Sequence, residues 1–294
     1  MLGFGKNKAS NGQGLIGVKT GMSPSDLATF QKILHEKSGI VLTDSKRALV
    51  ESRVTQRLRA LNMDSYGVYL QFLQEDQSGE EMVQLIDVIS TNITKFFREP
   101  DHFDLLDSTL ENWAGQGMKH CRIWSAACST GEEPYTLAMT VHKHVLKHRL
   151  DLKILATDIS TRVLAHAQAG IYDEDRLVTV PDSLKSKYFR AQAGNAAGSY
   201  AVSEELKRLI MFHRLNFTVF PYPIKGMFDV IFCRNAMIYF DRDLRTRMVR
   251  EFARLLKPGG ILMIGHSETL MGLDNLYRTI KPSVYLRLND GVDG

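Results

Sequence analysis

The sequence predicts an α/β protein with an open, mostly parallel sheet covered by helices, preceded by a small helical domain. Short apolar strand patterns alternate with helical patterns from about residue 121 onward, which is typical of such a sheet. Residues 23–90 show four helical patterns and no strand pattern. The segment 171–216 is too long for a simple helix-to-strand connection, which indicates an insertion.

The helical domain is expected to begin after a flexible arm, residues 1–22, that is rich in Gly, Lys and Asn. Ser23 suits the N-cap of a helix, and Pro24 suits the first position of that helix. Asp26 is favourable near its positively polarised N-terminal end. Gly39 is expected to end this helix. Three more helices are expected over about 45–61, from residue 65 and from residue 78.

The second domain is expected over residues 120–294, after a linker and helix at 91–119 that contribute to its ligand site. Its predicted strands are 121–127, 153–157, 228–233 and 261–265, and its predicted helices 135–146, 161–169 and 244–255. The insertion, at about 171–215, is expected to be a β-hairpin with strands 187–191 and 199–202 joined by 193–198.

Composition narrows the class of protein. The chain has 294 residues, of which 44% are hydrophobic and 24% charged, as in ordinary globular proteins. Its net charge of +4 is too small to indicate nucleic-acid binding, and its three cysteines are scattered, without metal-ligand spacing. Because no apolar run approaches membrane-spanning length and the N-terminus lacks a signal-peptide pattern, a cytoplasmic location is expected.

The loop that follows the first predicted strand carries the strongest chemical signal. Small residues and Gly131 allow a ligand to approach the backbone closely, and Pro134 suits the first turn of the next helix. A dinucleotide-binding loop would place a pyrophosphate at that helix start, but here Glu132 and Glu133 would repel it. The loop therefore favours a cationic or hydroxyl-rich ligand without phosphate and argues against NAD.

Three further strand ends carry polar residues, and ligands of such sheets bind beyond the carboxyl ends of the strands. Asp158 is suited to the two hydroxyls of a ribose, the alternative being a helix N-cap, for which Ser160 is also available. Asn216 with Phe217 suits an adenine, although Asn at a strand end is commonly a turn residue. Asn235 lies between two apolar runs, which turn chemistry alone does not explain.

Five motifs lie along the chain in this order: TNITKFFRE at 91–99, WSAA at 124–127, STGEEP at 129–134, FCRN at 232–235 and GHSE at 265–268. Together they resemble the CheR family, the chemotaxis protein methyltransferases that methylate glutamate side chains of bacterial chemoreceptors. The resemblance covers about residues 23–288.

The resemblance implies a Rossmann-like class I methyltransferase fold with a mostly parallel seven-stranded sheet, an N-terminal helical domain and an antiparallel β-subdomain. It implies S-adenosyl-L-methionine (SAM) as cofactor, S-adenosyl-L-homocysteine as product, and no metal. Phe217 and Ala236 depart from the aliphatic residues common at those positions. The cofactor contacts implied are Asn92, Thr94, Arg98, Glu133, Asp158, Asn216, Phe217, Asn235 and Ala236.

Two residues are predicted to act in catalysis. A glutamate substrate is ionised at neutral pH, so no general base is needed, and none is apparent. Arg98 is suited to hold a carboxylate in two hydrogen bonds, either the receptor glutamate or the cofactor's own carboxylate. A surface ion pair with Glu99 or Asp101 is the alternative for Arg98. Tyr239 is expected to line the same site or to be a core tyrosine.

The expected partners are the methylation helices of chemoreceptors, contacted by a basic stripe of Lys46, Arg53 and Arg57 in the helical domain. A receptor C-terminal peptide adding a strand to the β-subdomain is a further hypothesis. No nucleic acid, no membrane insertion and a monomer are expected. His142, His144 and His148 share a helix without an apparent carboxylate partner and are interpreted as a solvated face.

Two alternatives remain at this point: a methyltransferase of the same fold with another acceptor, and a cofactor-sensing adaptor that binds without turnover.

Overall fold

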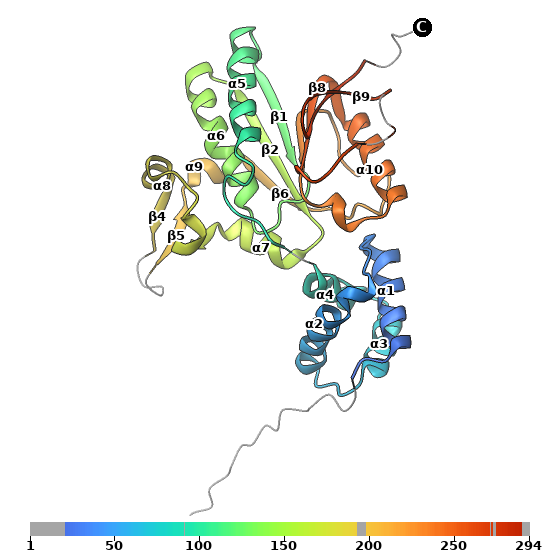
Figure 1. Ribbon diagram of the computed structural model, residues 1–294. Coiled ribbons are helices and arrows are strands. Elements are labelled where there is room, and N and C mark those ends of the chain that lie inside the picture. The colour runs from blue at the N-terminus through green and yellow to red at the C-terminus, as the bar shows by residue number, and fades with distance from the viewer. Residues whose placement is uncertain (1–20, 91, 193–197, 271, 273–274, 290–294) are drawn as a thin grey trace, which may run out of the picture. The chain divides into compact units, whose positions relative to one another are not determined.

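The computed structural model describes residues 21–90, 92–192, 198–270, 272 and 275–289 (Figure 1). These residues form two compact units, one of 21–30 with 43–89 and one of 31–42 with 90–289. Residues 1–20 of the predicted N-terminal arm lie outside the described residues. Among the described residues, none of the helices is both long and apolar enough to span a membrane.

The first unit is helical. Ser23 caps its first helix as expected: its hydroxyl accepts the N–H of Asp26 at 3.0 Å, and the Asp26 carboxylate accepts the N–H of Ser23 at 3.1 Å. Buried Phe30, Val54 and Leu58 contribute to its core. The helices are α1 (Pro24–Ser38, shared with the second unit from Gln31), η1 (Asp44–Lys46), α2 (Arg47–Ala60), α3 (Tyr66–Glu75) and α4 (Glu80–Ile89).

The basic stripe of α2 is partly engaged within this unit. Arg57 holds the carboxylate of Glu81 with two hydrogen bonds of 2.7 and 2.6 Å, and the Tyr69 hydroxyl donates to the same carboxylate at 2.6 Å. Arg53 donates to the carbonyl oxygen of Val88 at 3.0 Å. Arg57 is therefore a structural residue of the helical unit, whatever else it contacts.

The second unit contains a seven-stranded sheet in the order β6-β2-β1-β7-β8-β10-β9. The first five of these strands pair in parallel, and β10 pairs antiparallel with both β8 and β9. The predicted α/β fold with a mostly parallel sheet is thereby confirmed. The strands are β1 (His120–Ser125), β2 (Asp151–Asp158), β6 (Ile210–Arg214), β7 (Phe228–Cys233), β8 (Leu256–Ile264), β9 (Tyr277–Lys281) and β10 (Val284–Arg287).

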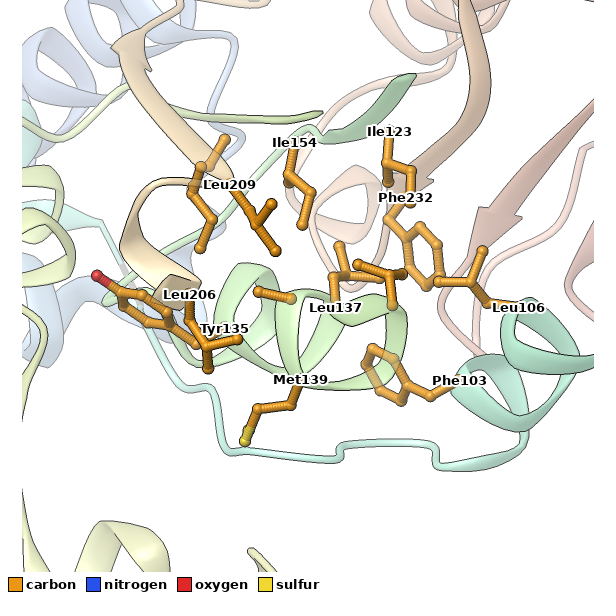
Figure 2. Close-up of a cluster of buried hydrophobic side chains, with 14 of the residues drawn as sticks. Phe103, Leu106, Ile123, Tyr135, Leu137, Met139, Ile154, Leu206, Leu209 and Phe232 are labelled. Carbon is orange, nitrogen blue, oxygen red and sulfur yellow. The ribbon is translucent and has the colours of Figure 1, made fainter. Parts of the chain in front are cut away.

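Both faces of this sheet are covered, because neighbouring residues of its buried strands enter different clusters. Ile123 of β1 joins the cluster with α5 (Asp101–Gly115) and α6 (Glu132–His148), whereas Trp124 joins the one with α10 (Arg242–Leu255). Figure 2 shows Phe103 of α5 and Leu137 of α6 meeting the strand side chains on the first face. The remaining helical elements are α7 (Thr161–Ala169), η2 (Glu174–Leu177), α8 (Asp182–Tyr188), α9 (Glu204–Lys207) and η3 (Met237–Tyr239).

The insertion forms a separate antiparallel sheet in the order β3-β5-β4. The predicted hairpin is confirmed as β4 (Phe189–Ala191) and β5 (Ser199–Val202), and residues 193–197 between them lie outside the described residues. The sequence analysis did not predict the third strand, β3 (Ile171–Asp173), which pairs with β5.

The interpretation of the α6 histidines as a solvated face is wrong. His142 and His144 are 6% and 1% exposed, and His142 Nδ1 lies 3.0 Å from the Tyr188 hydroxyl. His144 meets Asp107 of α5 at 2.7 Å. The carboxylate partner missing from the α6 sequence is thus supplied by the neighbouring helix.

Candidate cofactor and methyl-transfer site

The candidate site lies at the carboxyl edge of the parallel strands, which is the ligand-binding edge of such sheets. We use "carboxyl-edge site" for the loops after β1, β2 and β7 together with residues 92–99. These loops are joined by side-chain hydrogen bonds. Ser129 of the first loop donates its N–H to Asp158 at 2.9 Å and its hydroxyl to the carbonyl oxygen of Asn92 at 3.3 Å.

The two glutamates at the start of α6 have different surroundings. Glu132 is fully buried and held by the Thr130 hydroxyl at 2.6 Å and by Arg176 at 3.2 Å. Glu133 instead accepts from the Ser125 hydroxyl at 2.7 Å and from Arg234 at 3.2 Å. Glu133 therefore belongs to the carboxyl-edge site, whereas Glu132 ties the turn to the inserted segment.

Gly131 is required at this turn for two reasons. Its φ of +99° is readily adopted only by glycine. A Cβ at this position would also lie 2.6 Å from the Tyr172 hydroxyl and 2.9 Å from the Ala167 Cβ. The turn can therefore pack against the inserted segment and α7 only without a side chain.

Asp158, at the end of β2, is not the cap of the next helix. Ser160 is the N-cap residue of α7, with its hydroxyl accepting from the Val163 N–H at 3.3 Å. The Asp158 carboxylate accepts the N–H groups of Ser129 and Ser160 at 2.9 and 3.0 Å. These bonds fix the orientation of the carboxylate at the edge of the site.

Asn92 presents a buried donor without a partner. Its side-chain nitrogen Nδ2 makes no hydrogen bond in the part of the chain that the structure describes. A buried amide is costly to leave unpaired, so such an atom at a ligand-binding edge fits a bond to a bound group.

Arg98 donates to the carbonyl oxygen of Ile93 at 3.0 Å. Among the described residues it pairs with no carboxylate, so the alternative of a surface ion pair with Glu99 or Asp101 is not found. Glu99 instead pairs with Arg234 at 2.9 Å. The guanidinium of Arg98 thus retains donors for the carboxylate of a ligand.

Arg234, which the sequence interpretation did not select, connects the loops of the site. Its side chain is 1% exposed and bonds Glu99 and Glu133 at 2.9 and 3.2 Å. It also donates to the carbonyl oxygen of Arg98 and lies over the ring of Phe103, 5.3 Å from the centroid. A cation directly after the fully buried strand β7 was the available signal, because a buried arginine must have acidic partners.

Burial and neighbouring charges shift the pKa values of three groups around Arg234. Burial, the largest influence, raises the pKa of Glu133 despite the attraction of Arg234. Burial also acts to raise the pKa of Glu99, but the charge and hydrogen bonds of Arg234 and the Asn235 amide outweigh it, so the pKa is lowered. Burial, assisted by the charge of Arg234, lowers the pKa of His102 to about 4.

Asn235 begins the loop after β7 and is fixed by Glu268. The Glu268 carboxylate accepts the N–H groups of Gly265, Asn235 and Ile238 at 2.7, 2.9 and 3.3 Å. The Asn235 amide donates to Glu99 at 3.3 Å. The sequence motif that contains Glu268 is thus a clamp on the Asn235 loop.

Backbone strain is concentrated at the carboxyl-edge site. Of the seven non-glycine residues with positive φ in the described ranges, four lie in its loops, with φ between 48° and 58°. Such conformations cluster at functional sites, where the surroundings hold them in place. The four are Phe97, Glu99, Ser129 and Asn235.

Asn216, Phe217 and Ala236, which the sequence also predicts as cofactor contacts, have side chains that are engaged within the protein. The Asn216 amide is used within the second unit, donating to the Lys37 carbonyl at 2.7 Å and accepting from Thr218 at 3.0 Å. Phe217 packs its ring among aromatic side chains and is 9% exposed, and Ala236 is 8% exposed in the same cluster. Only their backbone groups are therefore suited to contact a ligand.

Thr94 is partly exposed between Ile93 and Phe96. Tyr239 ends η3, is partly exposed, and its carbonyl oxygen accepts from the Val41 N–H at 2.8 Å.

Comparison with known proteins identifies both units. The family model described as "CheR methyltransferase, SAM binding domain" matches residues 92–286, and "CheR methyltransferase, all-alpha domain" matches residues 25–90. The chain is 39% identical over 280 residues to the chemotaxis protein methyltransferase of Borreliella burgdorferi, covering 93% of this chain and 98% of that protein. It is 37% identical over 269 residues to the Escherichia coli chemotaxis protein methyltransferase, covering 92% and 93%.

Proposed function

Because the chain belongs to the CheR methyltransferase family, we propose that it transfers the methyl group of SAM to glutamate side chains of chemoreceptors, forming methyl esters. The observation that carries this proposal is the guanidinium of Arg98, which has no carboxylate partner among the described residues and adjoins an acidic site. The acidic site suits the positively charged sulfonium of SAM, and the Arg98 guanidinium suits the negatively charged carboxylate of a glutamate.

The residues of the carboxyl-edge site fit SAM. We propose that Asp158 accepts the ribose hydroxyls, that the unpartnered Asn92 Nδ2 donates to the cofactor, and that Glu133 accepts from it. The backbone at Asn216–Phe217 and at Asn235–Ala236 borders the adenine in this proposal. Thr94 stays a predicted contact.

The proposed chemistry needs orientation and not proton transfer. SAM supplies an electrophilic methyl group on a sulfonium, so the acceptor oxygen forms a C–O bond as the C–S bond breaks. A receptor glutamate is already ionised near pH 7, so no base is required. Arg98 holds a carboxylate in line with the methyl group, and Tyr239 lines the acceptor side. No step of this transfer uses a metal.

The proposal extends to partners. The enzyme acts in the cytoplasm as a monomer on the methylation helices of receptors, without nucleic acid and without entering the membrane. A receptor C-terminal peptide would add to an edge of the three-stranded sheet, where β4 is one of the outer strands. Of the glycines between β4 and β5, Gly198 has a φ of +112° and Gly194 lies outside the described residues.

The test incubates the protein with labelled SAM and membranes that contain chemoreceptors. Base-labile label on the receptor supports the methyl ester, whereas stable label on RNA, or binding without transfer, would contradict it. Arg98→Ala should lower the transfer rate by roughly 100-fold or more with the thermal unfolding curve unchanged, since a charge-assisted bidentate contact is lost. The control, Arg278→Ala on exposed β9, should retain full activity; equal rates in the two variants would remove Arg98 from the mechanism.

Receptor docking is tested separately at α2. Arg53→Ala should raise the KM for receptor and leave SAM affinity unchanged. Arg53→Lys keeps the positive charge, so its KM for receptor should stay close to that of the unmodified protein. Arg57 is a poor test residue, because its pair with Glu81 stabilises the helical unit. A changed SAM affinity with an unchanged receptor KM would contradict this docking surface.

A further inference from the structure

The facing sides of α5 and α6 carry two carboxylates and two imidazoles far from the N-terminal ends of both helices. Asp107 and Glu111 are four residues apart on α5, and His144 and His148 are four apart on α6, so each pair shares one helix face. No step of the methyl transfer uses these four residues.

Three ligand atoms converge at this place. His144 Nδ1 lies 3.3 Å and His148 Nε2 lies 3.2 Å from the same carboxylate oxygen, Oε2 of Glu111. Ligands about 2.1 Å from a tetrahedral metal ion are roughly 3.4 Å apart, so both spacings match those of a coordination shell. The three ligand atoms all lie within 4.8 Å of one another.

The hydrogen bonding of His144 prepares one nitrogen for a cation. Its Nε2 lies 2.7 Å from Asp107 Oδ1, and a carboxylate oxygen must accept, so Nε2 carries a proton. In the neutral ring, Nδ1 is then a bare lone pair. This atom is buried and makes no hydrogen bond among the described residues, although it points toward Glu111.

His148 Nε2 donates to Glu111 Oε2 at 3.2 Å, and this proton would be released when an ion binds. His144 Nδ1 and Glu111 Oε2 are instead two acceptors 3.3 Å apart, which repel unless a positive charge lies between them. An imidazole that donates its second N–H to a carboxylate is the common arrangement of histidines that bind metals. The Asp107–His144 pair has this arrangement.

We propose that Glu111, His144 and His148 bind one divalent transition-metal ion of the Zn²⁺ class, with Asp107 orienting His144. Two imidazoles and one carboxylate suit such an ion, and a water completes a tetrahedral shell. The side chains of Glu111 and His148, 47% and 20% exposed, give access from solvent.

Two lysines border the site without occupying its ligand atoms. Lys147 pairs with the other oxygen of Glu111, Oε1, at 2.5 Å, and Lys143 pairs with Asp107 Oδ2 at 2.6 Å. Their side chains are 62% and 59% exposed, so they can turn toward solvent when an ion enters.

A second group of suitable residues, Glu99, His102 and His266, is a poorer candidate. There, Glu99 already accepts from Arg234, from the Asn235 amide and from the His266 N–H. The buried guanidinium of Arg234 would also repel a metal ion. Glu111 also accepts hydrogen bonds, from Lys147 and His148, but Lys147 is exposed and among the described residues no buried arginine or lysine adjoins this carboxylate.

The bound ion would join the two helices that lead to the carboxyl-edge site. α5 begins two residues after Glu99, and α6 begins at Glu132. A link between Glu111 and His144 restrains the helices relative to each other, which is a structural role and not a chemical one.

The test is titration of the metal-free full chain with Zn²⁺ at pH 7.5 by calorimetry, with Co²⁺ absorption as a second probe of coordination. We expect one ion per chain with a micromolar Kd, and a shift of Tm to higher temperature on saturation. His148→Gln and Glu111→Gln should each weaken binding at least about tenfold. The control His120→Gln removes an exposed histidine, 3.0 Å from Asp151, and should leave binding unchanged.

Circular dichroism without metal establishes that each variant is folded. Nitrogen NMR supplies a readout that needs no variant: a shift of the ring nitrogen signals of His144 and His148 on addition of Zn²⁺ is expected. One-to-one binding that persists in both ligand variants would overturn the proposal. Absence of Zn²⁺ binding at concentrations up to about 100 µM, which is 100-fold above the expected Kd, would also overturn the proposal.

Discussion

Replacing Arg234 by Met tests whether this residue holds the carboxyl-edge site together. The substitution keeps the length and apolar character of the side chain but leaves Glu99 and Glu133 without their cation. Breaking a buried ion pair from one side costs about 3–5 kcal/mol, because the remaining charge stays buried. That is a large part of the roughly 5–15 kcal/mol that stabilises a typical protein.

The assay is urea unfolding followed by circular dichroism at pH 7.5 and pH 5, with SAM affinity measured by calorimetry. In the variant, burial without the cation raises the folded pKa of both carboxyl groups above the unfolded value. A group with a raised folded pKa contributes stability when protonated and loses it as pH rises, so the variant should regain stability toward pH 5. SAM affinity should fall at both pH values because the Arg98 and Glu133 loops lose their common partner.

Arg122→Met is the matched control, since Arg122 pairs with Asp151 at 2.7 Å but both side chains are more than a third exposed. An exposed pair contributes about 0–1 kcal/mol. A loss below about 1 kcal/mol in Arg234→Met, or one equal to that of the control, would refute the role assigned to Arg234.

Two further predictions concern polar side chains with contrasting partners. Asn92→Ala should weaken SAM binding roughly tenfold by calorimetry and leave the unfolding free energy unchanged, because its Nδ2 has no partner among the described residues. Asn216→Ala should instead lower the unfolding free energy by about 1–2 kcal/mol, since its amide forms hydrogen bonds with Lys37 and Thr218. A loss of stability in Asn92→Ala together with a loss of SAM affinity in Asn216→Ala would contradict both assignments. His102, with a pKa lowered to about 4, contributes stability above pH 6.5 that is lost as pH falls toward 4. His102→Phe should remove this loss, up to roughly 3 kcal/mol, in urea unfolding at pH 4.5 and 7.5, and an unchanged pH dependence would contradict it.

The fold was predictable because its signals are local. The central buried strands β1, β2, β7 and β8 contain short apolar runs, and several helices show their own periodicity or caps, as Ser23 and Ser160 illustrate. Loops after parallel strands must meet at one edge, so the neighbourhood of Glu133, Asp158 and Asn235 followed from chain order alone.

What the sequence could not provide is pairing across the fold. Arg234 and Glu99 are 135 residues apart, and nothing local to either shows that they meet. The same limitation produced the incorrect interpretation of His144, whose partners Asp107 and Glu111 lie on another helix. Orientation is also a tertiary property: Phe217 is at the expected strand end, but its ring turns into the aromatic core.

The left-handed residues of the carboxyl-edge site have a consequence for engineering and for evolution. Strained non-glycine conformations cost on the order of 1 kcal/mol each or more, so glycine at Ser129 would relax the backbone. At Glu99, glycine would also leave the buried Arg234 without one of its two carboxylates, which costs more than the strain that it relieves. Selection for heat resistance alone would therefore favour glycine at Ser129 and not at Glu99. Glycine at Ser129 would, however, remove the hydroxyl that ties the loop to Asn92. A laboratory search for thermostable variants should thus gain stability at Ser129 only at the expense of catalytic turnover.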